Sequence, residues 1–189
     1  MPFISSKNFS KLVEVQLHTH QNFTLVEYQQ TAEILNDLST INRERAKSYE
    51  EASFLNFIFN LELRGSFALL ANQSRQNSFS LRQFLEQMQS HIPVSKKPLP
   101  QLSFGDLYNQ WKEMGVSFSG PNIYDMLISS EQGEEAIQVI YTRAIEQLPA
   151  GDLQYLLETQ LRGLQTSHSI VKGILNQPQK MPQKMKKSI

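Results

Sequence analysis

The amino-acid sequence predicts an all-α fold, and three observations favour it. The prolines of the 189-residue chain leave residues 3–92, 122–148 and 150–177 free of helix breakers. Apolar residues recur mostly at spacings of three and four, which places them on one face of a helix. Strand signals are weak, because the Asn-Gly and Asp-Gly dipeptides of tight hairpins are absent. We therefore expect one domain built from long helices.

The first predicted helix begins at Thr24, where Thr24-Leu-Val-Glu27 has the spacing of a capping box. A break is needed before Pro93, since one helix reaching that far would be unusually long for a globular protein. We place the break between Ala52 and Asn60. The inward stripe predicted for this first helix consists of Tyr28, Leu35, Leu38, Ile41, Asn42, Arg45, Tyr49 and Ala52.

The second predicted helix begins at Asn56 or Asn60, since either residue can act as an N-cap. It should end before Pro93, because the residue before a proline disfavours the helical conformation. Its predicted inward face carries Leu63, Phe67, Leu70, Ser74, Asn77, Leu81, Leu85 and Met88.

A crossover segment is expected next. Residues 93–102 contain three of the prolines and should be extended. A short helix should follow, because Ser103-Phe-Gly-Asp106 again has the spacing of a capping box. Its predicted apolar edge consists of Leu107, Trp111 and Met114.

Two further helices complete the prediction. One begins near Pro121, a favourable residue for a first helical turn, and ends at about Gln147. The last begins with Asp152 as its N-cap. Its predicted stripe consists of Leu153, Leu157, Leu161, Leu164, His168, Val171 and Leu175.

These elements define the expected domain organisation. Residues 24–175 form a four-helix bundle, residues 1–23 an N-terminal extension, and residues 176–189 a basic tail that we expect to be disordered. The short connections predict two antiparallel hairpins, whereas residues 93–118 are long enough to cross the length of a bundle. One long crossover between two helical hairpins is the ferritin-like arrangement.

Several segments carry a resemblance to a known family. They are Arg45-Ala-Lys-Ser-Tyr49-Glu-Glu-Ala52, Trp111-Lys-Glu-Met114, Glu131-Gln-Gly-Glu134-Glu-Ala136 with Tyr141, and Glu158-Thr-Gln-Leu161 with His168. In order and spacing, over roughly residues 25–175, they resemble a bacterial family of ferritin-like domains of unknown function. The resemblance implies a four-helix bundle and no established activity. It also suggests a role linked to stress.

Composition limits the classes of partner. The chain has 18 basic and 18 acidic side chains, so it lacks the positive field that nucleic acids or anionic membranes attract. It has no cysteine, which excludes thiolate catalysis and cysteine-ligated metals. No apolar run is long enough for a signal peptide or a membrane span. We expect a cytoplasmic protein that binds neither nucleic acid nor membranes.

The sequence lacks the full ligand set of a di-iron bundle. Such sites take a Glu from each of two helices and a Glu-x-x-His motif from each of the other two. The fourth predicted helix has Gln165-Thr-Ser-His168 instead, and the second has Ser74 and Asn77 at its inward midpoint. We therefore expect no complete di-iron site and no cofactor.

His168 allows two interpretations, because a histidine in a leucine stripe needs a polar partner. It could be a neutral core imidazole that is hydrogen-bonded to Glu134, Tyr49, Tyr141 or a water molecule. Alternatively, it could bind a single divalent metal such as iron, manganese or zinc together with Glu134. Glu44 or Glu131 would complete the ligand shell of that site.

Two hypotheses for function follow. The leading one is a non-enzymatic bundle with a structural or interaction role, and the alternative is a metal-binding or redox bundle that uses the reduced Glu/His site. The protein partner is not indicated. A cluster of large apolar residues near the first turn exceeds what a turn needs, so part of it is expected to form a homodimer interface. The cluster consists of Phe54, Leu55, Phe57, Ile58, Phe59 and Leu61.

Overall fold

The computed structural model describes residues 25–55, 61–90, 105–114 and 123–176, and these residues are all-helical. They contain α2 (Leu25–Leu55), α3 (Leu61–Ser90), α4 (Asp106–Glu113), α5 (Ile123–Glu146) and α6 (Asp152–Leu175). No strand occurs in these ranges, so the predicted all-α class is confirmed. None of the helices described is long and apolar enough to cross a membrane.

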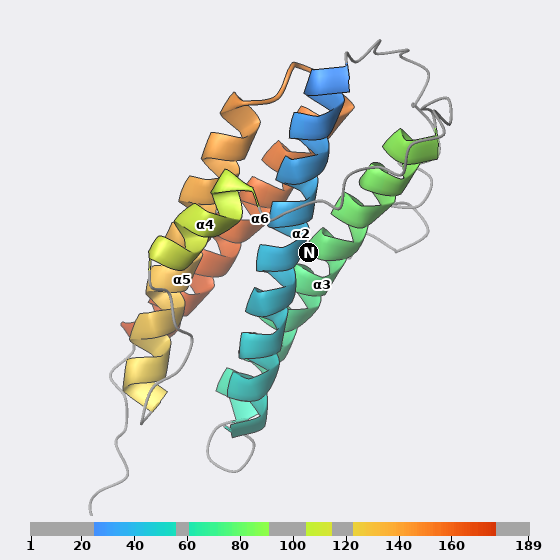
Figure 1. Ribbon diagram of the computed structural model, residues 1–189. Helices are drawn as coiled ribbons and strands as arrows, with labels where there is room; N and C mark the ends of the chain where they lie inside the picture. The colour runs from blue at the N-terminus through green and yellow to red at the C-terminus, as the bar shows by residue number, and fades with distance from the viewer. Residues whose placement is uncertain (1–24, 56–60, 91–104, 115–122, 177–189) are drawn as a thin grey trace, which may run out of the picture.

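The long helices form two antiparallel hairpins. Figure 1 shows α2 beside α3 and α5 beside α6, with the short α4 lying against α2 and α5. Helices α3 and α5 run in the same direction, and α4 lies between them in the sequence.

Helices α2 and α3 bury the faces that the apolar pattern predicts. Every residue of the predicted α2 stripe is buried, and so are the predicted α3 residues up to Leu81. Leu85 and Met88 are only partly buried against the core. Ser39 and Ser78 hydrogen-bond across the hairpin, with 2.9 Å between their hydroxyl oxygens. The α2 stripe includes Asn42 and Arg45, so the helix face that enters the core is polar at its middle.

The helix caps differ from the predictions. Helix α4 begins after Gly105, which makes no side-chain cap of its own, and Ser103 lies outside the described residues. Helix α6 begins after Gly151, so the prediction of Asp152 as N-cap is wrong. Asp152 instead occupies the first turn, where its negative charge still interacts favourably with the helix dipole.

The buried stripe of α6 also differs from the prediction. Leu161, His168 and Leu175 are only partly buried, and Gln160 and Ser167 are buried in place of Leu161 and His168. With Gln160 and Ser167 included, successive buried residues of α6 are spaced alternately four and three positions apart. The buried residues are Leu153, Leu157, Gln160, Leu164, Ser167 and Val171. The prediction was wrong here because it ranked Leu161 and His168 as better core residues than Gln160 and Ser167. The amide of Gln160 and the hydroxyl of Ser167 are buried because they form hydrogen bonds inside the bundle.

Several predictions lie outside the described residues. They concern the extension 1–23, the cap at Thr24, the N-caps proposed within 56–60, the extended segment 93–102, the helix start at Pro121 and most of the basic tail.

Candidate functional site

A fully buried ion pair lies at the centre of the bundle. Arg45 from α2 and Glu134 from α5 both have side chains with no solvent exposure. The Arg45 Nη2 atom donates to Oε1 and Oε2 of Glu134 at 2.6 and 2.7 Å, and Nε donates to Oε1 at 2.8 Å. Such a forked contact satisfies a carboxylate with several charge-assisted hydrogen bonds at once.

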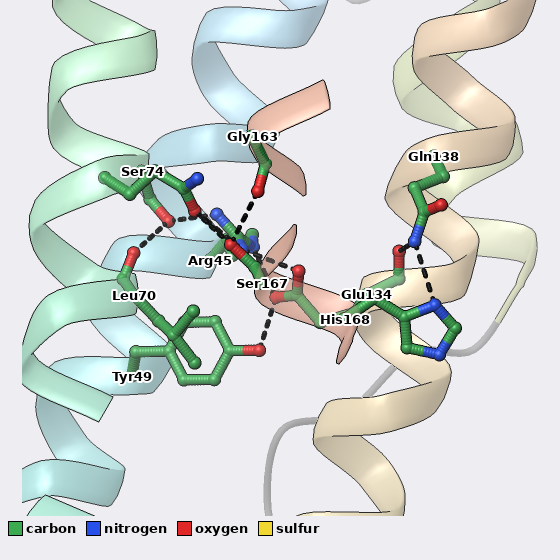
Figure 2. Close-up of polar contacts among 10 residues, drawn as sticks. Arg45, Tyr49, Leu70, Ser74, Glu134, Gln138, Gly163, Ser167 and His168 are labelled. Carbon is green, nitrogen blue, oxygen red and sulfur yellow. Dashed lines mark hydrogen bonds and ion pairs between the residues drawn. The ribbon is translucent and has the colours of Figure 1, made fainter. Parts of the chain in front are cut away.

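Side chains from α2, α3 and α6 surround this ion pair, and Figure 2 shows Tyr49, Ser74 and Ser167 among them. The Tyr49 hydroxyl donates to Glu134 Oε1 at 2.5 Å, and Arg45 Nη1 donates to the Ser74 hydroxyl at 2.6 Å. From α6, the Ser167 hydroxyl donates at 2.5 Å to Oε1 of Gln73 on α3. That same Gln73 oxygen accepts from Arg45 Nη2 at 3.4 Å. We call these six residues the central layer, and they join α2, α3, α5 and α6.

Electrostatics keep Arg45 charged and Tyr49 neutral. Burial is the largest single effect and lowers the pKa of Arg45, but Glu134, Tyr49 and Tyr141 together outweigh it, so the guanidinium pKa is raised. Burial, and then the charge of Glu134, hold the pKa of Tyr49 well above its ordinary value. Tyr49 is therefore a neutral phenol that donates a hydrogen bond. The Cζ atom of Arg45 lies 5.3 Å from the centroid of its ring. The layer contains one cation and one anion.

A second buried polar chain crosses the bundle. The Asn42 amide on α2 donates to the Tyr141 hydroxyl at 2.7 Å, and that hydroxyl donates to Gln160 Oε1 at 2.7 Å. Gln160 Nε2 then donates to the backbone carbonyl of Asn77 on α3 at 3.3 Å. Burial raises the pKa of Tyr141, so this phenol also stays neutral.

His168 of α6 contacts two residues of α5 that are not part of the central layer. Its Nε2 atom is 2.9 Å from Glu131 Oε1, and its Nδ1 atom is 3.1 Å from Gln138 Nε2. The side chains of His168 and Glu131 are each about one fifth exposed, at 21% and 23%. The partners expected for a core histidine, Glu134, Tyr49 and Tyr141, are not among these contacts.

Helix α4 is attached to α2 through a second buried carboxylate. Asp37 accepts hydrogen bonds from the backbone amides of Gly105 at 2.9 Å and Tyr108 at 3.0 Å, and so caps α4 from another helix. Gly105 permits this approach, because a Cβ atom there would lie 2.7 Å from Asp37 Oδ2. The Tyr108 hydroxyl donates to Glu44 Oε1 at 2.6 Å, and this bond raises the Tyr108 pKa to about 12.

The structure brings together only two of the four residues predicted as metal ligands. Glu131 and His168 contact each other, whereas Glu134 lies in the central layer and Glu44 binds Tyr108. Among the described residues no three His, Asp or Glu side chains are grouped so that they could hold a metal ion. Both Glu134 oxygens already accept hydrogen bonds from Arg45, so the residues at the bundle centre do not fit a metal.

Sequence reasoning placed Arg45 and Glu134 on inward faces but did not pair them. The pairing could have been predicted from their opposite charges. A buried charge needs a partner, and both residues were expected inside the same bundle. Gln160, Ser167 and Asp37 were missed because their side chains are polar. For Gln160 and Ser167 the available signal was their spacing, three residues after Leu157 and Leu164 on the buried face of α6.

Comparison with known proteins gives no further identification. No family model, curated protein or solved structure matches the chain. The residues and their geometry therefore carry the functional argument.

Proposed function

We propose that this protein is a ferritin-like four-helix bundle with a non-enzymatic, structural or interaction role, whose centre is closed by its own ion pair. The observation that carries the proposal is the contact between Arg45 and Glu134, with both side chains fully buried. The guanidinium supplies the positive charge that a bound cation supplies in a metal-containing bundle.

The charge balance and the hydrogen bonds of the central layer support a structural role for its residues. A catalytic or metal-binding carboxylate needs a free lone pair and access for its ligand, whereas the Glu134 oxygens accept from Arg45 and Tyr49. The cation and the anion of the layer cancel. Such networks, when every member is paired, favour one packing arrangement of the helices over others.

The ferritin-like assignment is supported by chain direction. Helices α3 and α5 run in the same direction, with α4 between them in the sequence. An up-down-up-down bundle would reverse direction at this connection. The link to stress is supported only by the sequence motifs that resemble the bacterial family.

A second candidate function is metal binding at Glu131 and His168. Their 2.9 Å contact and partial exposure favour it, because an imidazole and a carboxylate are two of the ligands that divalent metals use. Water molecules would have to supply the remaining ligands, so this pair would bind iron, manganese or zinc weakly.

Metal content tests both candidates. The protein and its His168→Ala and Glu134→Gln variants would be incubated separately with iron, manganese and zinc, desalted, and measured by elemental mass spectrometry. We expect background metal in all three proteins, and the same melting temperature with and without a chelator. Near-stoichiometric metal that is lost in His168→Ala would establish the second candidate. Metal lost only in Glu134→Gln would contradict the proposed metal-free centre.

A further inference from the structure

Two buried amide atoms beside the second polar chain have no hydrogen-bond partner among the described residues. They are Oδ1 of Asn42 on α2 and Nδ2 of Asn77 on α3. Asn42 has no solvent exposure, and Asn77 is only 8% exposed. Buried polar atoms are almost always hydrogen-bonded, to the protein or to an internal water molecule, because an unpaired one costs free energy. The two atoms therefore indicate a site for a bound molecule.

Neighbouring contacts fix the orientation of the Asn42 amide. Its nitrogen donates to the backbone carbonyl of Leu38 at 2.8 Å and to the Tyr141 hydroxyl at 2.7 Å. A backbone carbonyl can only accept, so the amide atom that faces Leu38 is the nitrogen. The single hydrogen of the Tyr141 hydroxyl is donated to Gln160. The Asn42 oxygen is therefore an acceptor that needs a donor from elsewhere.

The two asparagines lie at the same level of the α2–α3 hairpin. On one side of them Arg45 contacts Ser74, and on the other side Ser39 contacts Ser78. Each asparagine is three positions from the member of the first pair on its own helix, and both steps lead toward the second pair. Equal steps along antiparallel helices cover equal lengths, so the asparagines are opposite each other between two levels that are already in contact.

We propose that Asn42 and Asn77 form a binding site for one internal water molecule, which donates to Asn42 Oδ1 and accepts from Asn77 Nδ2. The ligand of this site must offer both a donor and an acceptor, and water offers both. A cation would be repelled by the N–H groups of Asn77. An anion would be repelled by the carbonyl oxygen of Asn42. The pair of amide atoms therefore selects a small neutral ligand.

The water molecule closes the second polar chain into a ring. The chain runs from the Asn42 amide through Tyr141 and Gln160 to the backbone carbonyl of Asn77, and the water connects the Asn77 amide back to Asn42. The ring takes one residue from each of α2, α3, α5 and α6. Connected hydrogen bonds strengthen one another where the local dielectric constant is low. None of these residues belongs to the central layer, so the inference does not depend on the proposed function.

Oxygen-17 magnetic relaxation dispersion tests the site in solution, because its amplitude counts water molecules that stay inside the protein for longer than the protein tumbles. Asn77→Leu removes the amide donor, nearly preserves the side-chain size and keeps the backbone carbonyl that accepts from Gln160. We expect this variant to lower the amplitude by the contribution of a single water. Ser39→Ala is the matched control, because it removes a buried hydrogen bond of the same hairpin but keeps both amides. Circular dichroism would verify that each variant is folded.

A high-resolution crystal structure of the wild type locates the water without relying on any variant. We expect one density peak within hydrogen-bond distance, about 2.7–3.2 Å, of both Asn42 Oδ1 and Asn77 Nδ2. A direct hydrogen bond between the two amides, or no peak between them, would overturn the proposal. So would an unchanged dispersion amplitude in folded Asn77→Leu, or an equal loss of amplitude in Ser39→Ala.

Discussion

Glu134 and Asp37 are both buried carboxylates, but the protein stabilises them in opposite ways. Glu134 lies at the bundle centre, where the Arg45 guanidinium neutralises its charge. Asp37 lies at the junction of α2 and α4, where it accepts hydrogen bonds from the backbone amides of Gly105 and Tyr108. The nearby Glu33 adds repulsion, and burial, the largest effect, leaves the Asp37 pKa raised.

The contrast shows what each site can do for the fold. A fully paired ion pair fixes the relative positions of four long helices, because each buried charge is held by its partner. A carboxylate held by amides fixes one short helix and carries an uncompensated charge. We therefore expect the centre to control global stability and the α2–α4 junction to control a local, pH-sensitive attachment.

The largest effect should come from breaking the ion pair. Arg45→Met leaves Glu134 buried without its cation, so the free energy of unfolding should fall by about 3–5 kcal/mol. Urea unfolding measures the loss. Arg45→Lys is the matched control, because it keeps the charge but loses the forked contact, and it should lie between the wild type and Arg45→Met. A loss no larger than that of an exposed arginine would make the pair energetically unimportant.

A smaller effect is expected at the junction. Asp37→Ala leaves two amides of α4 without a cap and should cost roughly 0.5–2 kcal/mol. Trp111, the one tryptophan of the chain, is buried on α4 at 3% exposure, so its fluorescence reports attachment of this helix. Its emission should shift to longer wavelength in Asp37→Ala before the other helices unfold.

Glu33→Gln is the control for that experiment, because it alters the same helix one turn away and leaves the two Asp37 hydrogen bonds in place. An unchanged Trp111 spectrum in Asp37→Ala would mean that Leu107 and Trp111 hold α4 by packing alone.

The smallest effect is a pH dependence that belongs to Asp37. Because its folded-state pKa is raised, its contribution to stability is fully present below the unfolded pKa and is lost as pH rises through the folded pKa. The stability of the wild type relative to Asp37→Asn should therefore increase between about pH 7 and about pH 4, as measured by urea unfolding. A relative stability that falls on acidification would show that the two amides outweigh burial.

The fold was more predictable than the site, for a physical reason. Proline positions and apolar spacing locate helices because burial of a periodic face is the main driving force, and the α2 stripe from Tyr28 to Ala52 was correct throughout. The α6 stripe was wrong at Leu161 and His168, because hydrogen bonding in the core reversed the ranking by hydrophobicity. Pairings such as Arg45 with Glu134 join residues far apart in the chain, so one sequence does not reveal them.

A helix cap that comes from another helix is equally hard to predict from one sequence. Asp37 caps α4 from a position that is distant in sequence, and only the close approach at Gly105 makes this possible. The local capping signals at Ser103 and Asp152 suggested other caps because local spacing is all that a capping motif records.

A double-mutant cycle between Arg45 and Glu134 tests the central claim most directly. Urea unfolding would be measured for the wild type, Arg45→Met, Glu134→Gln and the double variant. The ion-pair account predicts that the double variant loses much less stability than the sum of the two single losses, because removing both charges leaves none unpaired. Losses that simply add would contradict it, and would mean that Arg45 and Glu134 stabilise the bundle independently of each other.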